Sequence, residues 1–123
     1  MAPAPPGRAG SWATATRRPA RASVGGGACV LDVATRQPLG MGSILAAVRD
    51  RGRVGVVHEA AISGGYGAEI AARIASEGLF ELCAPIERVA GYDTVMPLSQ
   101  LEHLYMPDAG RIVEAARRAL TCE

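Results

Sequence analysis

The sequence predicts a layered α/β domain in which helices cover both faces of a parallel sheet. Short apolar runs of strand length alternate along the chain with longer segments whose apolar residues recur at helical spacing. The expected strands lack the apolar–polar alternation of a sheet with one wet face, which favours parallel strands covered on both sides. The length of 123 residues is that of one domain.

The leading residues 1–27 differ in composition from the rest of the chain. They are rich in Ala, Pro, Gly and Arg, contain no acidic residue and show no strand or helix period, so we expect a disordered basic arm. A transit peptide is the alternative, and it would place the protein in the mitochondrial matrix instead of the bacterial cytoplasm. The α/β domain is expected over residues 28–123, and a buried strand at residues 28–33 begins it.

Two strand–helix units are expected in the first half of the domain. Residues 41–50 place apolar side chains on one helical face, and Gly52 is well placed just past the helix end. Residues 54–57 are an apolar run that predicts the second strand. A turn is expected over residues 59–65, and residues 66–77 are predicted to form an amphipathic helix.

The second half is expected to add one strand and a final helix. Residues 86–90 predict a third strand, followed by a loop over 91–97 and one or two helical turns over 98–104. Asp108 is a good N-cap candidate for the last helix, since its carboxylate suits the positive end of the helix. The apolar residues expected on the inner face of that helix are Ile112, Val113, Ala116 and Leu120. Three strands make a narrow sheet, so further strands are expected from elsewhere.

Composition and charge exclude several functional classes. The net charge is +1, but the chain from Asp32 onward is mildly acidic and carries no basic stripe with interleaved aromatics, so we expect no nucleic-acid binding. No apolar run approaches the roughly 20 residues that span a bilayer, so no membrane segment is expected. Cys29, Cys83 and Cys122 are far apart with no Cys-x-x-Cys, which argues against a disulfide framework or zinc site and favours a reducing compartment.

The candidate chemistry lies around the second strand and the turn after it. His58 and Glu59 are adjacent on an extended chain, so their side chains point to opposite sides and do not form a dyad. His58 is interpreted as a hydrogen-bonded structural or interface residue. Gly64, Gly65 and Tyr66 open a helix after a strand, but Ile70 stands where a dinucleotide fingerprint requires Gly or Ala and no Walker lysine exists, so a structural turn is favoured over phosphate binding.

The loop after the third strand supplies a second group of candidates. Asp93 is expected to cap backbone amides, and contact with a partner is the alternative interpretation. Tyr92 and Thr94 flank it. No catalytic triad, metal cage or paired carboxylates at fixed spacing were found, so we predict no catalytic, cofactor-binding or metal residues. The predicted interface residues are His58, Glu59, Gly64, Gly65, Tyr66, Tyr92, Asp93 and Thr94.

Three sequence blocks carry a family resemblance. They are HEAAISGGYGAEIAARI from His58 to Ile74, APIERVAGYDTVMP from Ala84 to Pro97, and LEHLYMPDAGRIVEAARRAL from Leu101 to Leu120. In this order they resemble the transketolase C-terminal-like domain of the beta subunit of thiamine-dependent 2-oxo acid dehydrogenases, which act on pyruvate or branched-chain 2-oxo acids. The resemblance is strong from Arg53 to Leu120 and fainter from Cys29.

The resemblance implies a three-layer α/β/α transketolase C-terminal fold with a mixed, mostly parallel sheet. It also implies a domain that takes part in assembly and is not catalytic itself. In that family two alpha and two beta subunits associate, and thiamine diphosphate with a divalent metal, Mg²⁺, sits between alpha and beta. The preceding beta-subunit domain meets the cofactor's pyrimidine ring and supplies the activating Glu. The C-terminal domain builds the subunit interface and helps to dock the lipoyl acyltransferase core. No catalytic residue of the family maps onto this chain, so none is expected to bind the cofactor here.

The chain departs from the family at its beginning. The pyrimidine-binding domain is missing, and residues 10–27 lack the strand and helix expected there, which predicts a truncated or frame-shifted beta subunit. Three functional hypotheses follow: an assembly domain of a 2-oxo acid dehydrogenase, inactive alone; a stand-alone module that binds alpha and beta subunits or the acyltransferase core; and a nucleotide-binding α/β protein.

Overall fold

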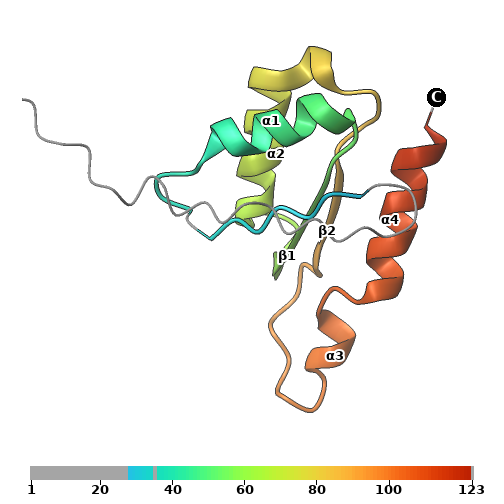
Figure 1. The fold of residues 1–123 in the computed structure, drawn as a ribbon. Helices are drawn as coiled ribbons and strands as arrows, with labels where there is room; N and C mark the ends of the chain where they lie inside the picture. The colour runs from blue at the N-terminus through green and yellow to red at the C-terminus, as the bar shows by residue number, and fades with distance from the viewer. Residues whose placement is uncertain (1–27, 35, 123) are drawn as a thin grey trace, which may run out of the picture. The chain divides into compact units, whose positions relative to one another are not determined.

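The computed structural model describes residues 28–34 and 36–122 (Figure 1). The described residues fall into two compact units, with the division between Ala47 and Val48. The arm expected over residues 1–27 lies outside the described residues, so its disorder and the domain boundary at residue 28 stay predictions.

The described part of the first unit begins without the expected strand. Residues 28–34 pair with no other segment among the described residues, and a short local bond joins Ala34 N to Asp32 O at 3.1 Å. The prediction of a strand at residues 28–33 is therefore wrong. An apolar run becomes a strand only when a neighbouring strand takes up its backbone donors and acceptors. The bridge between Arg36 and Leu39 is isolated and closes a tight turn before the first helix.

Helix α1, Met41–Arg51, confirms the first predicted helix. It ends where expected, because Gly52 adopts φ +67°, a left-handed conformation that glycine takes without steric penalty. Gly52 N donates to Val48 O at 2.7 Å, and Gly52 O accepts from Cys83 N at 2.7 Å. The end of α1 is thereby tied to the segment that leads into the second strand.

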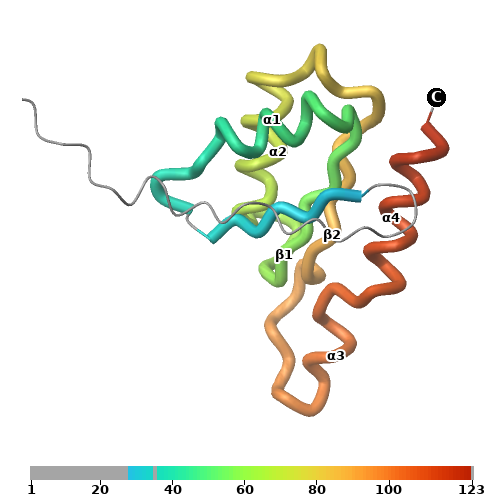
Figure 2. The backbone as a smooth tube through the Cα atoms, viewed as in Figure 1, coloured from blue at the N-terminus to red at the C-terminus, as the bar shows by residue number. Residues whose placement is uncertain are grey.

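The sheet of the second unit contains two parallel strands, β1 (Gly55–Ala61) and β2 (Glu87–Gly91). They run side by side in Figures 1 and 2. Val56 pairs with Arg88 and Val57 with Val89, and the register then shifts before Ala61 pairs with Gly91. β1 extends further than predicted, so the turn expected over residues 59–65 starts only after Ala61. The pairing with Gly91 holds this part of the chain in the sheet.

Two helices cover opposite faces of this sheet (Figure 1). α2, Tyr66–Gly78, packs on the face that carries Val56 and His58, and the 3₁₀ turn η2, Leu79–Glu81, follows it directly. α4, Ala109–Thr121, packs on the face that carries Val89. The α/β class, with helices on both sides of a parallel sheet, is thereby confirmed. The most deeply buried apolar side chains of this unit are Val48, Ile74, Val89, Ala90 and Ala115.

The inner face of α4 differs from the prediction. Ala115 and Ala119 face the sheet and are buried, whereas Ile112 and Leu120 are 39% and 67% exposed. Small side chains at i and i+4 allow the helix to approach the strands closely, so the larger apolar residues lie on the outward side. Val113 and Ala116 are exposed with them, which leaves an apolar stripe along α4.

The segment between β2 and α4 is largely irregular. Residues 98–104 were expected to form helical turns, and the structure contains a turn followed by the short helix α3, Glu102–Tyr105. The Tyr105 ring is buried against Gly91 at the end of β2. Asp108 caps α4 as predicted, and its Oδ1 accepts from Arg111 N at 2.7 Å. These two contacts fix both ends of the segment that follows the sheet.

Candidate functional site

Hydrogen bonds join the loops at the carboxyl ends of β1 and β2. Ile62 N donates to Gly91 O at 3.0 Å. Ser63 donates twice to the Asp93 carboxylate, from its backbone N to Oδ1 at 2.9 Å and from Oγ to Oδ2 at 2.6 Å. The two predicted groups of interface residues therefore form one surface, which we call the carboxyl-end surface: residues 59–66 and 92–94.

Asp93 acts as the cap that its loop position predicts. The Ser63 hydroxyl, and then the Ser63 backbone N–H, hold the pKa of the Asp93 carboxyl below its ordinary value of 3.8. Its donors come from the β1–α2 turn and not from its own loop, so Asp93 links the two loops.

His58 lies beneath this surface and not on it. Both imidazole nitrogens are buried and have no hydrogen-bond partner among the described residues, so the predicted hydrogen bonding of His58 is wrong. Its predicted place in an interface stays a prediction. A Cβ placed on Gly65 would meet His58 Cε1 at 2.6 Å, and one on Gly67 would overlap Cδ2 and Nε2. The two glycines therefore leave the space that the ring fills, and His58 is a packing residue.

The same packing bears on the nucleotide hypothesis. The positions that side chains at Gly65 and Gly67 would take are occupied by the imidazole of His58, which favours a structural reason for these glycines over phosphate binding. Gly64 has φ +70° and no neighbour near its missing Cβ, as expected for a structural turn. Glu59 is exposed, whereas the ring nitrogens of His58 are buried.

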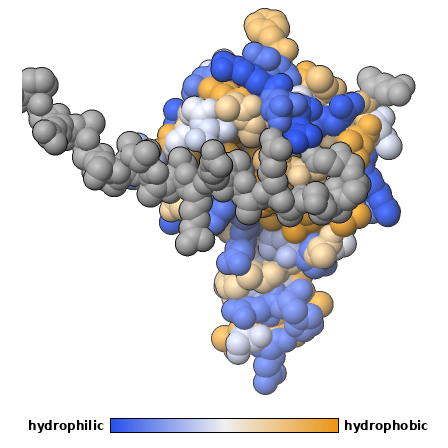
Figure 3. All heavy atoms as spheres, in the orientation of Figure 1, coloured by the Kyte–Doolittle hydropathy of each residue, from blue (hydrophilic) through white to orange (hydrophobic). Residues whose placement is uncertain are grey.

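The surface continues into apolar residues that sequence reasoning had not singled out. Tyr92 is 51% exposed, and Val95 and Leu98 are 88% and 86% exposed. Met96, Leu101 and Leu104 are also exposed, and Figure 3 shows small apolar areas among mostly polar residues around α3. A run of exposed large apolar side chains is typical of a protein contact. The sequence signal was an apolar run that follows no helical or strand period.

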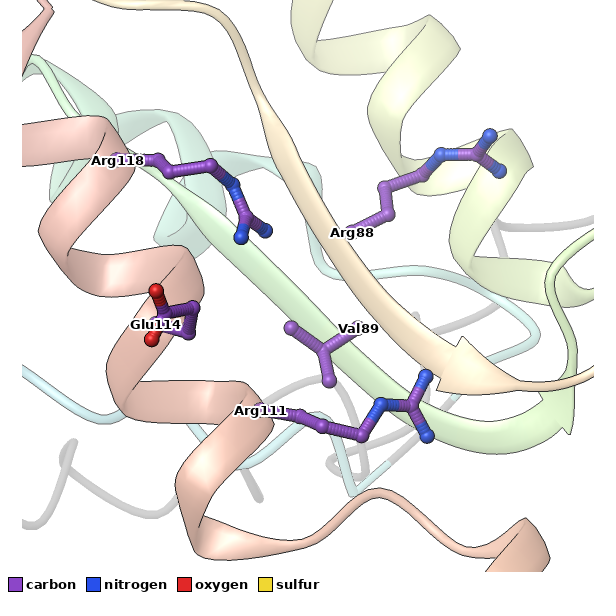
Figure 4. A pocket seen from close by; sticks show the side chains of 5 residues that line it. All are labelled: Arg88, Val89, Arg111, Glu114 and Arg118. Atoms are coloured by element: carbon purple, nitrogen blue, oxygen red, sulfur yellow. The ribbon is translucent and has the colours of Figure 1, made fainter.

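The described residues offer little for metal or cofactor chemistry. Within residues 28–34 and 36–122, no three His, Cys, Asp or Glu side chains gather as metal ligands. A hollow of about 160 Å³ lies between β2 and α4, lined by Arg88, Val89, Arg111, Glu114 and Arg118 (Figure 4). Cofactor sites usually measure about 300–1,000 Å³, so this one is the size of a side chain. Among the helices described, none is long and apolar enough to cross a membrane.

Comparisons of the sequence with family models and with curated proteins point to the same family. Residues 16–112 match the family model described as transketolase, C-terminal domain. The chain is 40% identical over 91 residues to pyruvate dehydrogenase E1 component subunit beta of Staphylococcus epidermidis, covering 74% of this chain and 28% of that protein. It is also 40% identical over 91 residues to 3-methyl-2-oxobutanoate dehydrogenase subunit beta of Mycobacterium tuberculosis, covering 74% and 26%. The chain thus spans about a quarter of the length of the curated relatives it matches.

Proposed function

The chain belongs to the transketolase C-terminal domain family, and we propose that it is the C-terminal assembly domain of a 2-oxo acid dehydrogenase beta subunit. In this proposal its partners are the alpha and beta subunits and the lipoyl acyltransferase core, and the full complex oxidatively decarboxylates pyruvate or branched-chain 2-oxo acids. The domain is not catalytic alone. The equal identity to a pyruvate and a 3-methyl-2-oxobutanoate dehydrogenase leaves the 2-oxo acid open. The cytoplasmic location stays a prediction.

The observation that carries the proposal is the carboxyl-end surface with its apolar continuation. Ser63 and Asp93 hold two loops together, so this part of the surface is preformed. Beside it, Val95 and Leu98 lie almost fully in solvent. Burying apolar area contributes about 25 cal/mol per Å², so covering such side chains drives association. A rigid polar rim next to apolar side chains is the composition of a protein interface.

Thiamine diphosphate and Mg²⁺ belong to the complex and not to this chain in the proposal. Mg²⁺ is held by carboxylates together with substrate or cofactor phosphates, and the described residues gather no such set. The hollow between β2 and α4 is also too small for that cofactor and presents arginines beside one carboxylate. The described residues do not fit the cofactor, and no catalytic step is assigned to them.

Association with the other subunits tests the proposal. The chain is mixed with purified alpha and beta subunits of a pyruvate dehydrogenase and, separately, of a 3-methyl-2-oxobutanoate dehydrogenase, and the dissociation constant is measured. We expect binding to one set, and Leu98→Asp should weaken it about tenfold or more because a charge is placed in a dry contact. Phe80→Asp is the matched control, since Phe80 is 99% exposed on η2, at the other end of the strands.

Two results would overturn the proposal. One is the absence of binding to either set of subunits. The other is thiamine-dependent decarboxylation by this chain without other subunits. A further experiment separates the alternative hypothesis of a stand-alone binding module from the assembly domain. Such a module would bind the assembled complex but would not restore activity to a beta subunit that lacks its own C-terminal domain.

A further inference from the structure

Arg111 is a partly buried cation whose hydrogen bonding is incomplete. Its Nη2 donates to Ala90 O at 2.6 Å, and its guanidinium lies over the Tyr92 ring with Cζ 4.6 Å from the centroid. Its Nη1 is buried and has no hydrogen-bond partner within residues 28–34 and 36–122. Arginine stays charged in proteins, and a buried donor without an acceptor is destabilising, so such a group in a native fold calls for a partner.

Among the described residues, no other charged side chain of the hollow accepts a hydrogen bond from Arg111 Nη1. Arg118 is paired with Glu87, whose Oε2 accepts from Arg118 Nη2 at 2.8 Å and from Nε at 3.1 Å. Figure 4 shows Arg111 and Arg118 both reaching from α4 toward β2, on either side of Val89. Within the described residues no carboxylate oxygen lies within 4.0 Å of the Arg111 guanidinium.

Arg88 is separate from this pair of arginines. Its side chain points toward the α2 side of the sheet in Figure 4, and its Nη1 donates to Ile62 O at 3.0 Å. Glu114 lines the hollow from α4. Among the described residues that line the hollow, Arg111 is therefore the arginine with a buried N–H group left without an acceptor, and it adjoins Tyr92 of the carboxyl-end surface.

The volume of the hollow and the planar shape of the Arg111 guanidinium limit which chemical group can bind there. The hollow of about 160 Å³ corresponds to about five waters at ~30 Å³ each, which is the space of one side chain. The planar guanidinium matches a carboxylate with two parallel N–H···O bonds. Val89 supplies an apolar floor that the methylene groups of an acidic side chain can cover.

We propose that Arg111 receives an Asp or Glu side chain of a partner subunit, which inserts between β2 and α4. The proposal rests on the proposed function, because it names the chemistry of a contact within that assembly. Tyr92 is half exposed and its ring lies over the Arg111 guanidinium, so the proposal requires this ring to move when the carboxylate reaches Nη1. The partner's acid then accepts the hydrogen bond that Nη1 lacks, and Val89 covers the methylene groups of the acid.

The test compares arginine variants in the same binding measurement. Arg111→Lys keeps the positive charge but cannot donate two parallel hydrogen bonds to a carboxylate. Arg111→Ala loses both the charge and the hydrogen bonds. Each is expected to weaken binding of the purified partner subunits about tenfold or more. Arg117→Ala, at an exposed position of the same helix, should change binding less than about twofold. Melting temperatures confirm that each variant is folded.

A second measurement covers the case in which the Arg111 variants fail to fold. The ¹⁵N–¹H signals of the Arg111 guanidinium are followed in the wild-type chain while partner subunits are added, and they are expected to shift. Binding by the wild type with unchanged affinity of both variants, or with no shift of these signals, would overturn this inference alone. No binding by the wild type would refute the proposed function, and this inference with it. A shift caused by acetate or inorganic phosphate but not by the partner would also overturn it.

Discussion

Gly67, the second residue of α2, lies directly against the imidazole of His58 on β1, so closely that a Cβ at Gly67 would overlap ring atoms. Both ring nitrogens lack a hydrogen-bond partner in the part of the chain that the structure describes, and the ring packs against Gly65 and Gly67. The start of α2 can therefore approach the sheet only if position 67 is glycine, and this approach sets the shape of the turn that precedes it.

Gly67→Ala should destabilise the domain by about 1–3 kcal/mol, because the added methyl must displace the ring or the helix. Urea unfolding measures the change. Gly42→Ala is the control, since Gly42 is a helical residue with no atom within 4 Å of its missing Cβ, and it should stabilise the protein by about 0.5–1 kcal/mol.

His58→Ala in the Gly67→Ala background should recover part of the loss, since the smaller side chain removes the overlap. Additive effects of the two substitutions would contradict this explanation of the turn.

We expect the free energy of unfolding to fall at low pH because Asp93 becomes protonated. Its folded pKa lies below the ordinary 3.8 because Ser63 donates to the carboxylate. Its contribution is therefore fully present above about pH 5, and it is lost as the pH falls through the folded pKa. The difference in unfolding free energy between wild type and Asp93→Asn, measured by urea titration at several pH values, should shrink as the pH falls below 3.8. Ser63→Ala should reduce the same difference, and a pH-independent difference would refute the link.

Asp108→Ala should cost about 1 kcal/mol by removing the N-cap of α4, whose Oδ1 accepts from Arg111 N. Thermal unfolding followed by circular dichroism measures it. Asp108→Asn keeps an acceptor of the same shape and should lose much less. Equal losses for the two variants would show that charge and not capping stabilises this end of the helix.

Ile74→Ala should destabilise the domain by about 2–5 kcal/mol, because this side chain is fully buried between α2 and the rest of its unit. Phe80→Ala should change stability by less than about 0.5 kcal/mol, since Phe80 is 99% exposed. Denaturant midpoints of the two variants provide the comparison. Equal losses for the two variants would contradict the link between burial and stability.

The sequence predicted the elements whose signals are local. The apolar run at the start of β1, the helical period of α2 and the cap at Asp108 each lie within a few residues, so their chemistry decides the structure. The end of β1 was placed too early because the pairing of Ala61 with Gly91 is a long-range contact.

The helix faces and the site depended on tertiary packing. α4 carries two apolar stripes, and the pattern of large residues favoured Ile112 and Leu120, whereas close approach to the sheet selects Ala115 and Ala119. The stacking of Arg111 on Tyr92 joins residues far apart in the chain, and no periodicity signals it. The loops at the strand ends were found because parallel strands bring their carboxyl ends to one edge.

The central claim is that the carboxyl-end surface and its apolar continuation are where this domain meets its partners. Hydrogen–deuterium exchange of the chain, alone and with the alpha and beta subunits, tests it most directly. We predict slower exchange in residues 59–66 and 92–104 and unchanged exchange in η2. Protection confined to η2, or no protection of residues 59–66 and 92–104 in a complex that demonstrably forms, would contradict it.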